Sequence, residues 1–108
     1  MIRLLYFSTA TQNMSGADVD EIIAHSVKNN TERDVTGMLA YNGRNFCQVL
    51  EGEKGTVDDL VEVIRADVRH SGFKVLGEKP ITQRHYEGWA MKRVDDLDFS
   101  EALNVMDA

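Results

Sequence analysis

The sequence is poor in cysteine, proline and long apolar runs, and each shortage argues against a class of protein. A single cysteine among 108 residues excludes an internal disulfide and is typical of a reducing cytoplasm, where we expect the chain to reside. One proline and eight glycines argue against a disordered or low-complexity chain. No apolar run approaches the ~20 residues of a membrane span, and no signal-peptide pattern opens the chain, so we expect no membrane partner.

Basic residues are also scarce. Twelve lysines and arginines stand against eighteen aspartates and glutamates, which gives a formal net charge of −6 and a pI near 4.9. A domain this acidic binds nucleic acid poorly without a basic patch, and the sequence shows none, so we expect no nucleic-acid partner. The hydrophobic fraction of 43% at this length is enough for one core, and we expect one domain.

The sequence lacks the short motifs of common active sites. Histidine and cysteine do not fall at metal-ligand spacing, so we predict no metal site. A Ser-His-Asp set, a P-loop and a dinucleotide-binding glycine motif are also absent. These absences give no indication of metal-dependent, hydrolytic or nucleotide-dependent chemistry.

Hydrophobic periodicity predicts seven elements in the order β-α-β-β-α-β-β. The predicted strands are residues 2–8, 35–41, 46–50, 73–76 and 89–93. Two helices are predicted to begin at capping boxes at residues 15–18 and 56–59, and the first is predicted to end at Asn29-Asn30. Apolar residues of the second helix recur at helical spacing at Val57, Leu60, Val61, Ile64 and Val68. This order predicts an α+β, ferredoxin-like fold, with a mostly antiparallel sheet and two helices on one face.

Two of the predicted strands carry a polar side chain at the middle of an apolar run. These side chains are Tyr6 and Gln48, and each needs a hydrogen-bond partner if it is buried, because an unpaired group costs about 1–3 kcal/mol. By itself, such a tyrosine is more often a packed aromatic residue. Strand alternation places a second apolar set on the opposite face of the sheet, and we expect either the C-terminal tail or a partner protein to cover it. That set is Leu5, Phe7, Cys47 and Val49.

Six short motifs, in the same order and at compatible spacing, resemble those of the BLUF domain, a flavin-binding blue-light sensor. They are RLLYFS at 3–8, SVKNN at 26–30, VTGML at 35–39, FCQVLEG at 46–52, DVRHS at 67–71 and WAM at 89–91. The resemblance covers the chain up to about Val94. It implies a BLUF flavin-binding domain at residues 1–94, followed at 95–108 by an acidic tail or by the start of a C-terminal helix or linker.

The resemblance also implies roles for four photoactive residues. Tyr6 would donate an electron and a proton to the excited flavin, and the amide of Gln48 would then rotate or tautomerise. Trp89 and Met91 would relay the change outward. Inverting an amide exchanges a donor for an acceptor without moving charge, which allows a small event to shift a two-state equilibrium.

The implied cofactor is FAD, with FMN or riboflavin as possible substitutes, held without covalent attachment. Apolar side chains from the two helices suit the faces of the flavin ring, and carboxamides suit its polar edge. The cofactor-binding residues implied by the resemblance are Tyr6, Ile22, Ser26, Asn29, Asn30, Gln48, Ile64, Asp67, Arg69 and His70. Two positions depart from many relatives, because Ala90 stands where serine is common and Val63 stands where some carry arginine.

Signalling without turnover is the function that the resemblance implies, so we expect no catalysis by this chain. The output would be a fused domain or a partner protein, and homo-oligomers are possible. The alternative is a colourless ferredoxin-like module for ligand sensing or protein interaction, which would lack the yellow colour of a flavoprotein. An acylphosphatase-like enzyme is disfavoured, since that chemistry requires an arginine in a glycine-rich loop after the first strand, and residues 9–14 contain neither residue type.

Overall fold

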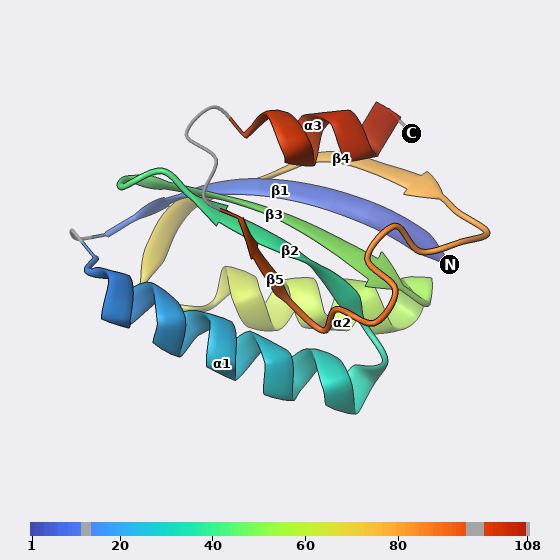
Figure 1. The fold of residues 1–108 in the computed structure, drawn as a ribbon, viewed down its shortest axis with the longest axis horizontal. Coiled ribbons are helices and arrows are strands. Elements are labelled where there is room, and N and C mark those ends of the chain that lie inside the picture. The colour runs from blue at the N-terminus through green and yellow to red at the C-terminus, as the bar shows by residue number, and fades with distance from the viewer. Residues whose placement is uncertain (12–13, 95–98, 108) are drawn as a thin grey trace.

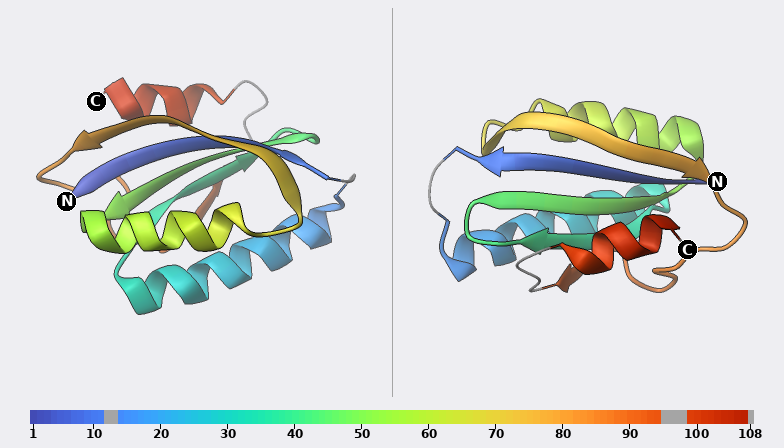
Figure 2. Two further views of the ribbon diagram at one scale, coloured as in Figure 1. Left: turned by 180° about the vertical axis from the view of Figure 1, so that it is seen from behind. Right: turned by 90° about the horizontal axis from the view of Figure 1, so that it is seen from above.

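A computed structural model describes residues 1–11, 14–94 and 99–107, and it shows a five-stranded sheet between two layers of helices (Figure 1). The elements are β1 (Ile2–Ala10), α1 (Gly16–Arg33), β2 (Thr36–Tyr41), β3 (Asn45–Gly52), α2 (Lys54–Arg65), β4 (His70–Pro80), β5 (Lys92–Val94) and α3 (Ser100–Asp107). The strand order is β4-β1-β3-β2-β5, and all neighbours are antiparallel except β2 and β5. Helices α1 and α2 lie on one face and α3 lies on the other (Figures 1 and 2). The predicted fold class is confirmed.

Two hydrophobic clusters flank the sheet, as the strand alternation predicts. Leu4, Tyr6 and Leu50 belong to the cluster on the side of α1 and α2. The opposite cluster is covered by α3, so the tail is the covering element seen here. Its buried members are Leu5, Met38, Ala40, Cys47, Val49, Tyr86, Phe99, Ala102 and Val105. Residues 95–98 and 108 of the predicted tail lie outside the described residues, and the domain boundary at residue 94 stays a prediction.

Helix α1 begins where the sequence predicts and ends later. Ser15 forms the predicted capping box, in which its hydroxyl accepts from the backbone N–H of Asp18 at 3.2 Å. The predicted end at Asn29-Asn30 is wrong, because α1 continues to Arg33. Asp34 then adopts a left-handed conformation with φ of 54°, and its N–H reaches the carbonyls of Asn30 and Thr31, which satisfies the helix end.

Helix α2 starts earlier than the predicted capping box at residues 56–59. The carboxylate of Glu53 accepts from the backbone N–H groups of Gly55 and Thr56, so Glu53 takes the N-cap position and the prediction is wrong. The helix ends at Arg65, and Val68, which the apolar stripe includes, is 85% exposed beyond it. None of the helices in the described part of the chain is long and apolar enough to cross a membrane.

The last predicted strand is also shorter than expected. Residues 89–91 precede the strand, which starts at Lys92. The backbone of Trp89 is nevertheless tied to the sheet, because its carbonyl accepts from the N–H of Gly37 at 3.1 Å. A loop-like segment at 81–91 therefore connects β4 to β5 and runs alongside the start of β2.

Candidate functional site

A cavity of about 280 Å³ opens between α1, α2 and the sheet. It combines apolar walls with a small number of polar groups, which is typical of sites for small organic ligands. It is lined by Tyr6, Ile22, His25, Ser26, Asn29, Leu39, Phe46, Gln48, Val63, Ile64, Asp67, Arg69 and His70. Nine of the ten residues predicted to bind the cofactor are therefore brought together, and Asn30 is not among them.

Tyr6 and Gln48 form a buried polar pair in this cavity. They lie directly opposite each other on β1 and β3, and their exposed fractions are 4% and 3%. The Tyr6 hydroxyl donates to Gln48 Oε1, and Gln48 Nε2 donates to Met91 Sδ at 3.5 Å. Each polar atom of the pair thus has a partner, as burial requires.

The Tyr6 phenol is held in its protonated form. Burial raises the pKa of this phenol well above its ordinary value, and the charges of Cys47 and Asp67 raise it further. The Tyr6 ring stacks on Phe73 with ring centroids 4.6 Å apart, which fixes its orientation. At neutral pH, the Tyr6 hydroxyl therefore keeps its proton and donates a hydrogen bond to Gln48.

Asn30, which is predicted to bind the cofactor, does not line the cavity and contacts the backbone of the chain. Its exposed fraction is 2%, and its Nδ2 donates to the carbonyl of Ala90 at 2.7 Å. Asn29, its neighbour on α1, lines the cavity in its place. The proposed contact of Asn30 with a flavin ring edge stays a prediction, while its observed contact ties α1 to the segment before β5.

Asp67 and Arg69 form an ion pair at one end of the cavity. Arg69 Nε donates to both carboxylate oxygens of Asp67, at 3.0 and 3.1 Å. These hydrogen bonds are the main cause of the lowered pKa of Asp67 and of the raised pKa of Arg69. Next to them, the His70 ring lies 2.7 Å from Ser8 Oγ and 2.6 Å from the Ile64 carbonyl, so the imidazole is oriented by β1 and α2.

Replacing Asp67 by asparagine should reduce stability at neutral pH more than in acid. Because the folded pKa of Asp67 is lowered, its contribution is complete above the unfolded pKa near 3.8 and is lost as pH falls through the folded pKa. Urea unfolding of both proteins between pH 7 and pH 2.5 measures this, and the difference in unfolding free energy should shrink below pH 4. A difference that is constant across this range would contradict the assignment.

The two residues predicted to relay the signal occupy different environments. Met91 is buried, with 4% of its surface exposed, and contacts the amide of Gln48. Trp89 is 54% exposed and does not line the cavity. A relay role for either residue stays a prediction, and only Met91 contacts the polar pair.

Four lining residues were not predicted from the sequence. They are His25, Leu39, Phe46 and Val63. Leu39 and Phe46 share the strand face of Tyr6 and Gln48, and His25 follows Ile22 by three positions on α1, so face periodicity could have identified them. Among the described residues, no group of three or more His, Cys, Asp or Glu side chains is arranged to hold a metal ion.

Comparison with known proteins gives consistent matches along most of the chain. The family model described as "BLUF: Sensors of blue-light using FAD" matches residues 1–92. The photoactivated adenylate cyclase subunit beta of Euglena longa is 36% identical over 83 residues, which cover 77% of this chain and 10% of that protein. The blue light- and temperature-regulated antirepressor BluF of Escherichia coli K12 is 33% identical over 105 residues, or 97% of this chain and 26% of that protein.

Solved structures agree with these matches. The dark-state structure of BlrB, a BLUF protein, has a TM-score of 0.83 at 31% identity and covers 98% of this chain and 81% of its own. A bacterial light-regulated adenylyl cyclase has the same TM-score at 32% identity, over 99% of this chain and 33% of its own. The chain spans from about a tenth to about a quarter of the length of these two curated relatives. With its cavity, its Tyr6–Gln48 pair and these matches, the chain belongs to the BLUF family, the sensors of blue light that use FAD.

Proposed function

We propose that this chain is a photoreceptor domain that binds FAD, FMN or riboflavin without a covalent bond in the cavity between α1 and α2. The photoactive element is the pair Tyr6 and Gln48. The observation that carries this proposal is the buried hydrogen-bonded series from the Tyr6 hydroxyl through the Gln48 amide to the Met91 sulfur. Through this series, a change in the hydrogen bonds at a bound ligand would alter the hydrogen bond that Met91 receives.

The lining residues fit a flavin. Ile22 from α1 and Ile64 from α2 offer apolar contact to the faces of a flat ring system. The carboxamides of Asn29 and Gln48 provide both donors and acceptors for a ring edge that carries C=O and N–H groups. Asp67, Arg69 and His70 provide polar groups for a ribityl chain and its phosphate. We therefore assign these side chains, with Tyr6 and Ser26, to cofactor binding.

When bound, the flavin would supply absorption of blue light and an excited state able to accept an electron. The chain supplies the hydrogen bonds that change. Tyr6 holds its proton on a hydroxyl that donates to Gln48 Oε1, and Gln48 Nε2 donates toward Met91. If the Gln48 amide inverts, Nε2 faces Tyr6 and Oε1 faces Met91, so the donor beside Met91 is replaced by an acceptor. This exchange leaves the net charge unchanged and can shift the equilibrium between two conformations of the residues around Met91.

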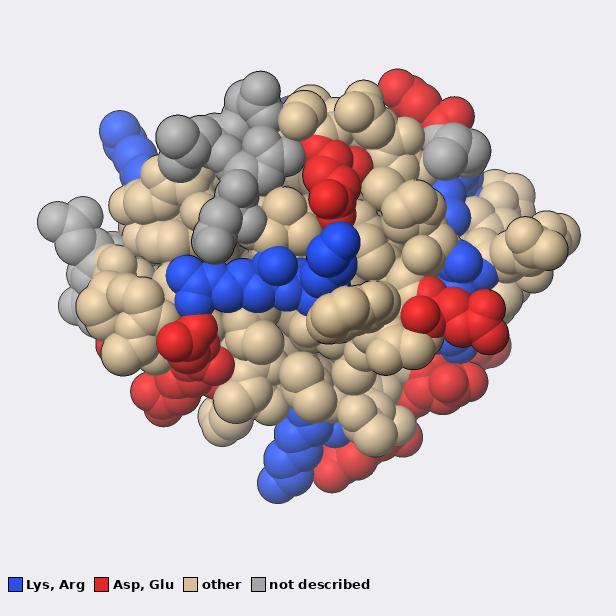
Figure 3. All heavy atoms as spheres, in the orientation of Figure 1, with Lys and Arg blue, Asp and Glu red and all other residues tan. Residues whose placement is uncertain are grey.

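We further propose that the chain signals and does not catalyse. Several relatives are named as photoactivated adenylate cyclases, so a fused output domain or a separate partner protein is a reasonable receiver of the signal. Assembly with a second copy of this chain and a cytoplasmic location belong to the same proposal. On the face shown in Figure 3, acidic and basic side chains lie close to each other.

An absorption spectrum of the purified protein, recorded in the dark and then under blue light, tests the proposal. We expect a flavin spectrum that moves slightly to longer wavelength under light and relaxes in the dark. A colourless protein that also fails to take up added FAD would contradict flavin binding and favour the colourless interaction module. A flavin spectrum that light leaves unchanged would contradict only the photoactive role of Tyr6 and Gln48, and flavin binding would stand.

A further inference from the structure

The sheet face opposite the cavity contains a buried ion pair that the proposed photochemistry does not use. Arg3 on β1 and Glu51 on β3 are 5% and 0% exposed, and Arg3 Nε donates to Glu51 Oε2 at 2.9 Å. The two residues lie opposite each other in the antiparallel register, as Tyr6 and Gln48 do further along the same strands. A buried pair of this kind is weak evidence for stability by itself, so its other contacts decide what it does.

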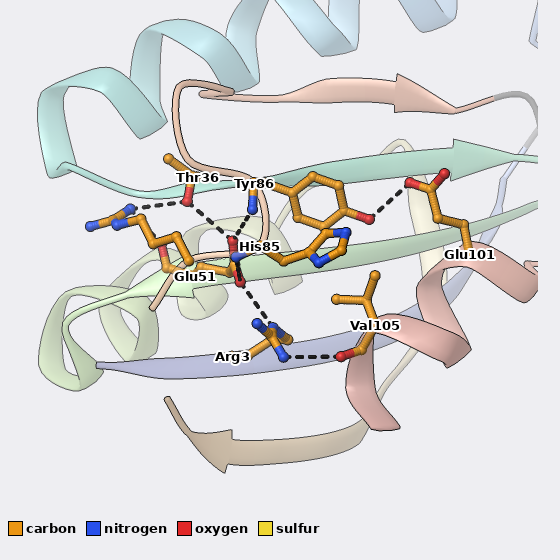
Figure 4. Close-up of polar contacts among 8 residues, drawn as sticks. Arg3, Thr36, Glu51, His85, Tyr86, Glu101 and Val105 are labelled. Atoms are coloured by element: carbon orange, nitrogen blue, oxygen red, sulfur yellow. Dashed lines mark hydrogen bonds and ion pairs between the residues drawn. The ribbon is translucent and has the colours of Figure 1, made fainter. Parts of the chain in front are cut away.

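The Glu51 carboxylate fixes the segment that leads to β5. It accepts from the backbone N–H of His85 at 2.9 Å and from that of Tyr86 at 2.8 Å (Figure 4). This segment continues to Ala90, whose carbonyl accepts from Asn30, and to Met91, which contacts the amide of Gln48. Glu51 therefore holds one end of the 85–91 segment while its other end touches the polar residues on the cavity side of the sheet.

Arg3 connects the same carboxylate to α3. Its Nη1 donates to the carbonyl of Val105 at 3.0 Å, and this carbonyl lies in the last turns of α3 (Figure 4). A second link runs from the Tyr86 hydroxyl to Glu101 Oε2 at 2.9 Å. Helix α3 is thus attached to the sheet both by its apolar side chains and by groups whose position depends on Glu51.

We propose that Arg3 and Glu51 form a positioning latch that couples the docking of α3 on the outer face of the sheet to the position of the 85–91 segment. The N–H groups of His85 and Tyr86 on one side and the Val105 carbonyl on the other share one buried charge pair, so displacing either element leaves buried polar groups unpaired and destabilises the other. The coupling itself stands on these contacts, and its use in light signalling rests on the proposed function. In that use, a change at Gln48 and Met91 would alter the docking of α3.

The chain contains a matched pair of reporters for this proposal. Cys47 is the only cysteine, is 1% exposed and lies in the cluster beneath α3, so its reaction rate with dithionitrobenzoate reports opening of that helix. Amide hydrogen exchange of residues 85–91, followed by mass spectrometry, reports the segment. Both are measured in the dark on the full chain as purified, so neither requires a response to light.

Glu51→Gln should raise both rates about tenfold or more, because an amide keeps the shape of the carboxylate and loses its charge and one acceptor. Glu62→Gln is the matched control, since Glu62 lies on α2 with its side chain 73% exposed, and both rates should stay within about twofold. The unfolded fraction from urea unfolding is used to correct both rates for global opening of the protein. If the larger unfolded fraction fully explains the increase in both rates, the latch is overturned. If Glu51→Gln does not unfold cooperatively, the same measurements are made on Arg3→Lys, which loses the planar guanidinium fork.

A second variant tests the coupling from the other side. Ala102→Glu places a charge at a fully buried position of α3, and Leu103→Glu, at a position 48% exposed on the same helix, is its control. We expect Ala102→Glu to raise Cys47 labelling and also the exchange of residues 85–91 at least threefold, and Leu103→Glu to do neither. Faster labelling with unchanged exchange at 85–91 overturns the coupling.

The double variant identifies Glu51 as the connection. In the Glu51→Gln background, Ala102→Glu should add little to the exchange of residues 85–91. Full additivity overturns the role of Glu51. The proposed function fails separately if light leaves the flavin spectrum unchanged, because these dark measurements are independent of it.

Discussion

Replacing Tyr6 by phenylalanine should abolish the light-induced spectral shift while leaving flavin binding intact. The substitution removes the hydroxyl that donates to Gln48 Oε1 and keeps the ring that stacks on Phe73. Without that donor, the Gln48 carbonyl is left without its partner in a site that is 3% exposed, which should also cost about 1–3 kcal/mol of unfolding free energy. The measurements are dark and blue-light absorption spectra and urea unfolding.

Tyr41→Phe is the matched control for this substitution. Tyr41 packs against the cluster on the same side of the sheet and its ring contacts that of Phe46 at a tilt, but its buried hydroxyl has no hydrogen-bond partner in the described structure. Removing it should leave the light response intact and stability equal or slightly higher. If Tyr6→Phe retains a full spectral shift, Tyr6 is a structural residue and the photoactive role assigned to it is wrong.

Gly37→Ala should be among the most destabilising single substitutions in the chain. A Cβ atom at this position of β2 would lie 1.9 Å from the carbonyl oxygen of Val49 and 3.0 Å from its carbonyl carbon. Both are backbone atoms of the neighbouring strand, so β3 would have to move, and with it Gln48. We expect a loss of about 3 kcal/mol or more, at or above the upper end of ordinary overpacking costs, together with weaker flavin binding.

Gly16→Ala provides the opposite expectation for the same chemical change. Gly16 is the first residue of α1, and an added Cβ would meet nothing within 4 Å. Alanine restricts the unfolded chain and favours helix, so stability should rise by about 0.4–1 kcal/mol. Urea unfolding with equal m-values would establish both effects. Equal, small effects at the two glycines would show that β2 and β3 adjust to the added methyl group.

Most elements of this fold follow from local patterns in the sequence. The alternation of strand residues separates Leu4, Tyr6 and Leu50 from Leu5 and Val49, and the structure buries the two sets on opposite faces. The element boundaries were less accurate. Asp34 ends α1 by adopting a left-handed backbone, later than the predicted asparagines, and Glu53 caps α2 with its side chain in place of the predicted threonine. In both cases a single cap residue decided the boundary, and helical periodicity does not identify it.

The candidate site was also partly visible in the sequence. The positions of Tyr6 and Gln48 at the middle of apolar strands predicted that each needs a hydrogen-bond partner if buried. The structure buries both, and the antiparallel register of β1 and β3 places them opposite each other. The resemblance supplied Ile22, Ser26 and Asn29 on α1 and Ile64 on α2, but not His25 and Val63. Asn30 and Trp89 were harder to place, because the segment before β5 is not a strand at residues 89–91 and its path is set by contacts with Gly37 and Glu51.

The sequence by itself determined which faces of its strands and helices are apolar, because those periodicities depend only on neighbouring residues. Only the tertiary structure decided which polar groups meet across the molecule. Arg3 and Glu51 are 48 positions apart, and Arg3 and Val105 are 102 apart, yet they form one buried network beneath α3. Such contacts arise from the packing of the sheet and the docking of the last helix, and local residue spacing does not encode them.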